Sequence, residues 1–277
     1  MIKLLNQDLS QYTTIKIGGI AREMLVPEDI KELLFIVNTF SPIYFIGGGS
    51  NLLIANREFD LVVDLRKFDD TIIHLGNGVF KVGASLRLQS LINTINRWGY
   101  GGIEYLYSVP GLVGGAIVMN AGRGKKHNRT ISDNVISVDL IRDGRIITLR
   151  KEECHFSHRC SIFQNSKDII IGCTMQFPQM EVEESALLKK ERIELCKKLQ
   201  DTSKPNFGSV FSENDPRIMN YVKKHKIGNR VHFSEKTSNW IINEGGSFQD
   251  ALSAIKKVEF LHKLIFKRCK REVIVWE

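Results

Sequence analysis

The chain has 277 residues, of which 43% are hydrophobic and 25% are charged, a composition that is typical of a folded globular protein and excludes a disordered chain. No stretch approaches 18 consecutive apolar residues, so the sequence predicts no transmembrane helix. The 39 lysines and arginines outnumber the 31 aspartates and glutamates, and the formal charge of +8 favours anionic small ligands over nucleic acid, because no nucleic-acid-binding signature accompanies it.

The first half of the chain alternates short apolar runs with two amphipathic helices. Apolar spacing predicts helices over about residues 30–37 and 85–98. Strands are predicted at residues 43–46, 61–65, 79–82 and 169–177, and a hairpin over 135–150 that turns at Asp143 and Gly144. Strands therefore dominate the first 180 residues, which indicates an α+β fold.

A charged helix over residues 182–199 and the polar stretch behind it form the best domain boundary. Beyond it the pattern predicts a small helix at 217–224, a strand at 240–242, a longer helix at 247–265 and a final strand at 272–276.

Two glycine-rich stretches carry the first chemical signal. One follows a predicted strand at residues 47–52 and the other spans residues 110–116. Glycines let backbone N–H groups converge on a phosphate without interference from side chains. Alone, the first stretch is better explained as a glycine-rich turn, and the second could be a tight packing crossover. Together, in a basic chain, they favour an extended dinucleotide whose pyrophosphate and flat ring system approach the backbone.

The motifs, taken in order, resemble those of the UDP-N-acetylenolpyruvoylglucosamine reductase family. The flavin-domain motifs are TTIKIGGIA (13–21), GGGSNLL (47–53), GIE (102–104), PGLVGGA (110–116) and NAG (120–122). The later ones are FSHRCSIF (156–163), GSVF (208–211) and REV (271–273). The resemblance covers nearly the whole chain and is most specific at the two glycine-rich stretches.

The resemblance implies a two-subdomain FAD-binding fold of the PCMH type, with a smaller α+β substrate domain. We expect the first subdomain at residues 1–57, the second at 58–199 and the substrate domain at 200–277, with a C-terminal strand that carries the catalytic glutamate. The implied activity is NADPH-dependent reduction of the enolpyruvyl ether of UDP-N-acetylglucosamine to UDP-N-acetylmuramate. This oxidoreductase reaction belongs to peptidoglycan synthesis, and so to cell-wall biogenesis, cell shape and division.

The resemblance also assigns site residues. Arg159, Ser209 and Glu272 match the family's electrostatic stabiliser, proton donor and acidic partner. The predicted FAD-binding residues are Gly47, Gly48, Gly49, Ser50, Asn51, Leu52, Pro110, Gly111, Gly114, Gly115 and Ala116. An arginine and an acid near the substrate carboxylate would stabilise negative charge there, and a hydroxyl could supply the proton. Each of the three could instead be a surface ion pair or a turn residue.

Several segments depart from the family pattern. A basic segment at residues 123–129 replaces a short tyrosine-containing turn, and we expect it to supply charge to a nucleotide pyrophosphate or to be a solvated insertion. His158 replaces a tyrosine, and residues 212–216 and 234–240 also differ. Two alternatives therefore stay open: a paralogue that reduces another nucleotide-sugar enol ether, or a flavin-binding protein without turnover.

The cysteines and the N-terminus bear on location and on metals. Five cysteines without a C-x-x-C pair argue against a disulfide framework, and the first residues do not resemble a signal peptide. The expectation is a cytoplasmic monomer or weak oligomer, with no nucleic-acid or membrane partner. The Cys and His residues at 154, 155, 158 and 160 fit no standard zinc spacing, so we expect no metal site.

Overall fold

The computed structural model of the chain describes residues 1–123 and 129–277. Two units make up the chain, each assembled from segments that are distant in the sequence. The first unit consists of Met1–Lys3, Leu25–Gly48 and Val62–Glu194, and the second of Leu4–Met24, Gly49–Leu61 and Leu195–Glu277. The three-part division at residues 57 and 199 stays a prediction.

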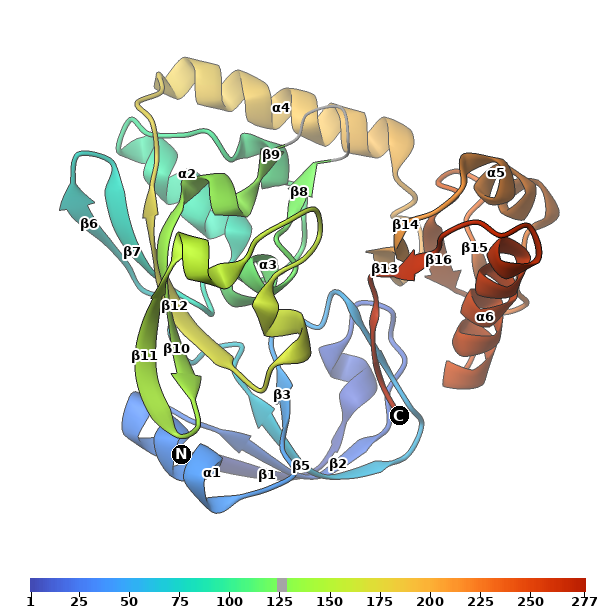
Figure 1. Ribbon diagram of the computed structural model, residues 1–277, viewed down its shortest axis with the longest axis horizontal. Helices are drawn as coiled ribbons and strands as arrows, with labels where there is room; N and C mark the ends of the chain where they lie inside the picture. Colours follow the sequence, from blue (N-terminus) through green and yellow to red (C-terminus); the bar gives the residue numbers. More distant parts are fainter. Residues whose placement is uncertain (124–128) are drawn as a thin grey trace. The chain divides into compact units, whose positions relative to one another are not determined.

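The first unit contains a five-stranded antiparallel sheet of order β11-β10-β12-β7-β6 (Figure 1). Its strands are β6 (Ile72–Gly76), β7 (Val79–Gly83), β10 (Val135–Arg142), β11 (Arg145–Arg150) and β12 (Ile169–Gln176). In the central part of the sheet, Val138 of β10 lies opposite Leu149 of β11 and Cys173 of β12, and all three are buried. Alternation along these strands therefore directs one set of side chains into a core.

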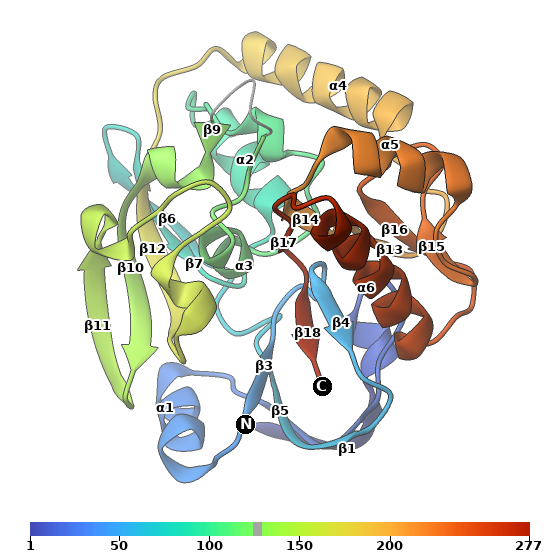
Figure 2. The same cartoon turned by 45° about the vertical axis from the view of Figure 1, so that its right-hand side comes forward.

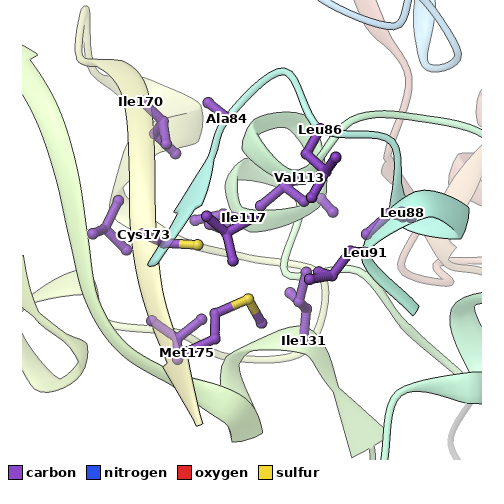
Figure 3. Packing of buried hydrophobic residues seen from close by; sticks show 14 of the residues in the cluster. Ala84, Leu86, Leu88, Leu91, Val113, Ile117, Ile131, Ile170, Cys173 and Met175 are labelled. Carbon is purple, nitrogen blue, oxygen red and sulfur yellow. The ribbon is translucent and has the colours of Figure 1, made fainter. Parts of the chain in front are cut away.

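Two helices, α2 (Leu88–Arg97) and α3 (Val113–Val118), pack with the sheet to form that core. Figure 3 shows Ile117 of α3 between Cys173 of β12 and Leu91 of α2. These three side chains are fully buried. Each large apolar side chain buried in this way contributes roughly 1.5–3 kcal/mol to folding. The core fixes α3, and with it the glycine-rich stretch from which α3 begins.

The other elements of the first unit surround this core. They are α1 (Ile30–Thr39), β3 (Tyr44–Ile46), β8 (Gly122–Arg123), β9 (Arg129–Thr130) and the part of α4 (Val182–Leu199) up to Glu194. Helix α4 is tethered by Arg192, whose Nε donates to Ser108 Oγ at 2.8 Å, and by Lys189, whose Nζ donates to Asn93 Oδ1 at 3.2 Å. Helix α4 is thereby fixed to the segment that leads into the second glycine-rich stretch.

A four-stranded sheet has the order β1-β2-β5-β3. Its remaining strands are β1 (Ile2–Asp8), β2 (Ile20–Val26) and β5 (Glu58–Asp64), and each of these runs from one unit into the other. Strand β3 pairs in parallel with β5. Short 3₁₀ helices occupy Leu9–Tyr12, Glu104–Leu106, Ile131–Asn134, Lys151–Cys154 and Ile162–Asn165.

The second unit combines a three-stranded sheet of order β13-β16-β15 with helices α5 and α6 (Figure 2). These elements are β13 (Asn206–Ser209), β15 (Val231–Phe233), β16 (Trp240–Asn243), α5 (Pro216–His225) and α6 (Phe248–Leu264). Helix α6 packs on β15 and on α5. Two strand pairs complete the unit: β14 (Phe211–Glu213) with β17 (Lys270–Arg271), and β4 (Leu52–Ile54) with β18 (Ile274–Trp276).

The structure confirms the α+β expectation, and α4 spans the predicted residues 182–199. The predicted last strand at 272–276 is wrong at its start. Strand β17 ends at Arg271 and β18 begins at Ile274, so Glu272 lies in the break between them. The C-terminal strand therefore does not carry this glutamate. Of the basic segment, residues 124–128 lie outside the described part of the chain.

No helix within the described ranges is long and apolar enough to cross a membrane.

Candidate active site

Within the first unit, the two glycine-rich stretches meet. Gly47 and Gly48 follow β3, and a Cβ atom added to Gly48 would lie 3.2 Å from Gly111 Cα. The second stretch is held by backbone bonds: Gly111 O accepts from Leu88 N at 3.3 Å, and Gly114 N donates to Ala84 O at 2.9 Å. Glycine at position 48 thus permits a backbone approach that a side chain would crowd.

The residues at this meeting point fit a bound dinucleotide. In the part of the chain that the structure describes, the backbone N–H groups of Gly48 and Gly111 form no hydrogen bond. A Cβ atom added to Gly115, in the middle of α3, would have no described atom within 4 Å. Unpaired N–H groups beside open space are what a pyrophosphate and a flat ring require. Pro110 and Ala116 flank these glycines within the same stretch.

The remainder of the first glycine-rich stretch belongs to the second unit. Gly49 has φ +61°, and its O accepts from Thr14 N at 3.1 Å. Ser50 and Asn51 follow, and Leu52 begins β4. A side chain at Gly49 would collide with the carbonyl of Tyr12, so this glycine is required by the fold itself.

Arg159 is positioned by the chain segment that leaves α3. It sits in a turn closed by the pair Ser157 and Cys160, with a left-handed φ of +54°. Its NH2 group donates to Gly122 O at 2.8 Å, and the Asn120 side chain donates to Ser157 O at 2.8 Å. The segment Asn120–Gly122 therefore holds the turn at one end and the guanidinium at the other. The same segment follows α3, which begins within the second glycine-rich stretch. The position of Arg159 is therefore linked to that stretch through α3.

Ser209 and Glu272 come together in the second unit. Glu272 N donates to the carbonyl of Val210, the residue after Ser209, at 2.8 Å. The adjacent ladder pairs Phe211 of β14 with Arg271 of β17. Ser209 and Glu272 are both half-buried. The two predicted catalytic residues of this unit thus lie on directly bonded backbone segments.

Asn51, predicted as a cofactor ligand, makes its observed contacts to the Glu272 segment. Its Nδ2 donates to Glu272 O at 3.0 Å, and its own carbonyl accepts from Ile274 N at 3.0 Å. These two bonds enclose Val273, which is buried. These bonds explain why β17 and β18 are separate strands. The backbone of Glu272 bonds to Asn51 and Val210, and so it does not continue the strand pairing of β17.

Asn239 is a site residue that the sequence did not indicate. Its side chain accepts from Phe211 N at 3.1 Å and donates to Phe211 O at 2.8 Å, while its own carbonyl accepts from Val210 N at 2.9 Å. The backbone polar groups of Val210 and Phe211 are thereby all bonded, either to Asn239 or to Glu272. The sequence signal was missing because Asn239, just before β16, and Phe211 of β14 lie 28 residues apart in the chain.

The Cys and His residues near Arg159 do not assemble a metal site. Within residues 1–123 and 129–277, no group of three or more His, Cys, Asp or Glu side chains could hold a metal ion. Cys154 is buried, its Sγ donates to Arg150 O at 3.4 Å, and burial raises the pKa of its thiol to about 11. A thiol with that pKa stays protonated and is a weak nucleophile.

Comparison with known proteins adds independent information. Residues 22–150 match a family model described as an FAD binding domain. The chain is 31% identical to the UDP-N-acetylenolpyruvoylglucosamine reductase of Thermotoga petrophila, with 98% of this chain and 97% of that protein covered. It is 33% identical to the Bacillus licheniformis protein of the same name, over 94% of this chain and 88% of that protein. The crystal structure of the Thermus caldophilus enzyme of that name matches with a TM-score of 0.81 and 25% identity, over 100% of this chain and 98% of that one.

Proposed function

The chain belongs to the UDP-N-acetylenolpyruvoylglucosamine reductase family, and we propose that its own residues serve that reaction at the site described above. The protein is an FAD-containing oxidoreductase of peptidoglycan synthesis, which reduces the enolpyruvyl ether of UDP-N-acetylglucosamine to UDP-N-acetylmuramate with NADPH. The observation that carries the assignment of residues is that the Glu272 backbone bonds both to Val210, the residue after Ser209, and to the Asn51 side chain.

FAD, when bound, supplies the hydride that it has received from NADPH. The chain's contribution to FAD binding is the meeting of Gly47 and Gly48 with the stretch from Pro110 to Ala116. Backbone N–H groups there can bind phosphate oxygens, and the open side of Gly115 leaves room for a ring.

The reaction needs stabilisation of negative charge at the substrate. Hydride addition to the terminal carbon of the enolpyruvyl double bond pushes an electron pair toward the substrate carboxylate. The Arg159 guanidinium, a permanent cation, stabilises the charge that develops there. The left-handed turn and the bond to Gly122 O orient this cation before substrate arrives. Preorganisation of this kind is what makes electrostatic stabilisation effective.

The adjacent carbon must then receive a proton. The half-buried Ser209 hydroxyl can donate the proton from Oγ. Its strand is fixed next to the Glu272 segment, and Glu272 acts there as the acidic partner. After transfer, the terminal carbon is a methyl group, the ether carbon carries hydrogen, and the double bond is gone.

A purified sample tests the proposal directly. The protein is expected to show the visible absorption of bound flavin, without a covalent link. NADPH oxidation should depend on the UDP-N-acetylglucosamine enolpyruvate. Flavin binding without substrate-dependent turnover would favour the non-catalytic alternative. Turnover with a different nucleotide-sugar enol ether in place of this one would favour the paralogue.

The location and assembly of the protein are also proposed. Both NADPH and UDP-sugars are metabolites of the cytoplasm, which supports a cytoplasmic enzyme. We propose that it acts as a monomer or weak oligomer, and sedimentation of the FAD-loaded protein at several concentrations measures this.

A further inference from the structure

Helix α6 has two faces of different character. Its inner face is buried and includes Ala251, Ile255, Val258 and His262. Its outer face displays exposed residues: Lys256, Lys257, Phe260, Lys263 and Leu264. At about 100° per residue, these outer side chains fall within an arc of roughly 120°. The outer face is therefore a continuous stripe that mixes lysine with large apolar side chains.

The turn that follows α6 extends this stripe. Phe266 is 96% exposed and has a left-handed φ of +52°. Its N–H donates to Lys263 O at 3.1 Å, and Lys267 N donates to His262 O at 2.9 Å, so the turn is tied to the end of the helix. A bulky residue in this conformation is a true outlier, and an aromatic ring in water gains nothing from folding. Both unfavourable features coincide at one residue, which indicates a role outside the fold.

Charge is concentrated at the same place. Of the sixteen residues 256–271, seven are lysine or arginine and only Glu259 is acidic. Glu259 is already paired with Arg271, whose Nε and NH2 both donate to it at 2.9 Å. Lys263, Lys267, Arg268 and Lys270 are exposed around Phe266. Four exposed cations thus lie close in sequence to Phe266, the most exposed aromatic side chain among the described residues.

We propose that this surface docks on an anionic lipid bilayer. We call it the α6 patch, and it consists of Lys256, Lys257, Phe260, Lys263, Leu264, Ile265, Phe266, Lys267, Arg268 and Lys270. The lysines and Arg268 face the anionic headgroups, while Phe266, Phe260 and Leu264 enter the boundary between headgroups and acyl chains. The contact is peripheral and reversible, and the enzyme remains in the cytoplasm.

The mixture of side chains favours lipid over other anionic partners. Aliphatic Leu264 and Ile265 have no favoured contact on nucleic acid, where aromatic stacking and hydrogen-bonding side chains dominate. An acidic protein would need a complementary apolar pocket for Phe266. A bilayer accepts apolar side chains of any shape and attracts lysine without fixed geometry. The proposal departs from the expectation of no membrane partner. That expectation rested on the lack of a long apolar segment and of a signal peptide, and a surface contact requires neither.

Vesicle flotation with the intact FAD-loaded protein tests the proposal. The protein is expected to float with vesicles of phosphatidylcholine and phosphatidylglycerol at 7:3 and to remain in solution with phosphatidylcholine alone. Binding should weaken as salt rises. Phe266→Gly is the key variant, because glycine suits the left-handed turn and improves folding while removing the anchor. We expect a loss of binding of roughly tenfold or more, since one buried aromatic side chain is removed.

A pair of charge variants separates the patch from overall charge. Lys263→Gln, Lys267→Gln and Arg268→Gln together should weaken binding about a hundredfold, because each cation near an anionic surface contributes about fivefold. Lys190→Gln, Lys197→Gln and Lys198→Gln remove the same charge from exposed positions on α4 and should leave binding nearly unchanged. NADPH oxidation in solution is the folding control for every variant.

Three results would overturn the proposal. One is equal flotation with neutral and anionic vesicles, and another is full binding by Phe266→Gly. The third is preference for polyglutamate or an RNA oligonucleotide over anionic vesicles at the same ionic strength, which would assign the α6 patch to an acidic protein or to nucleic acid.

Discussion

Arg159 has a backbone conformation that costs stability. A left-handed conformation costs a residue with a Cβ atom roughly 1–2 kcal/mol relative to the right-handed region. The turn persists because Asn120 binds Ser157 O and the Gln164 side chain donates to Arg159 O at 3.0 Å. The hydrogen bonds around Arg159 therefore hold its backbone in a conformation that the residue by itself does not favour, and so fix the position of its cationic side chain.

Two replacements of Arg159 distinguish the effect of its backbone strain from the effect of its charge. Both Arg159→Gly and Arg159→Ala lose the guanidinium and its bond to Gly122 O, so both should lose most substrate reduction. Glycine tolerates φ +54° and alanine does not, so the glycine variant should be the more stable by about 1 kcal/mol. Urea unfolding of the two variants measures the difference. A more stable alanine variant would show that the turn carries no strain.

Ser209 should matter in only one half of the reaction. The proton is needed when substrate is reduced and not when NADPH reduces the flavin, so Ser209→Ala should leave flavin reduction nearly unchanged. Flavin reoxidation by substrate should slow by about a hundredfold to ten-thousandfold, the usual range for a lost general acid. Stopped-flow absorbance resolves the two steps. Equal impairment of both would assign Ser209 a structural role.

At the scale of elements, Asn239 and Asn243, at the two ends of strand β16, provide a matched pair. Asn239 immediately precedes β16 and donates to Phe211 O at 2.8 Å, while Asn243 ends the strand and donates to Ile15 O at 2.9 Å. Each would lose one donor to a backbone carbonyl on replacement by aspartate, at a cost of about 1–3 kcal/mol in stability. Only Asn239 supports the segment beside Ser209 and Glu272.

We therefore expect different kinetics from two variants of similar stability. Asn239→Asp should slow flavin reoxidation at saturating substrate by roughly tenfold to a hundredfold, because small misplacement of a reacting group is costly. Asn243→Asp should be destabilised without a selective loss in that step. Thermal unfolding and stopped-flow measurements on both variants provide the comparison. A selective loss in Asn243→Asp, or none in Asn239→Asp, would contradict the positioning role.

The elements that could be predicted from the sequence are those with strong local patterns. Helix α6 begins with a capping box in which Ser247 and Asp250 bond reciprocally, and its apolar period continues to Leu264. Strand β1 was missed because its side chains are largely exposed, including Ile2 and Leu5, so no alternation marks it. The break at Glu272 was also missed. The run from Val273 to Trp276 looks continuous in sequence, and the bonds of the Glu272 segment to Val210 and to Asn51, 221 residues from Glu272, interrupt it.

At the scale of the whole molecule, the first glycine-rich stretch passes from one unit into the other between Gly48 and Gly49. Its conformation is therefore tied to both units, and a ligand bound to it stabilises the native chain against unfolding. A ligand at a hundred times its Kd adds about 2.7 kcal/mol of stability when it binds only the native state. For a chain of this size that corresponds to a rise in Tm of several degrees.

Two adjacent glycines of α3 allow this linkage to be tested. A Cβ atom at Gly114 would lie 3.1 Å from Ala84 Cβ, so Gly114→Ala should lower the Tm of the FAD-free protein. A Cβ atom at Gly115 would meet no described atom within 4 Å, and alanine is favoured over glycine inside a helix by about 0.5–1 kcal/mol. Gly115→Ala should therefore raise the Tm of the FAD-free protein, or leave it unchanged.

The two variants should respond differently to FAD. The fold itself gains nothing from glycine at position 115, and we predict that the open space there accommodates the flavin ring. We expect Gly115→Ala to lose most of the FAD-dependent rise in Tm although its FAD-free form is at least as stable as the wild type. Differential scanning fluorimetry, with and without excess FAD, measures both quantities on each variant. An undiminished FAD-dependent rise in Gly115→Ala would show that the flavin does not lie against this face of α3.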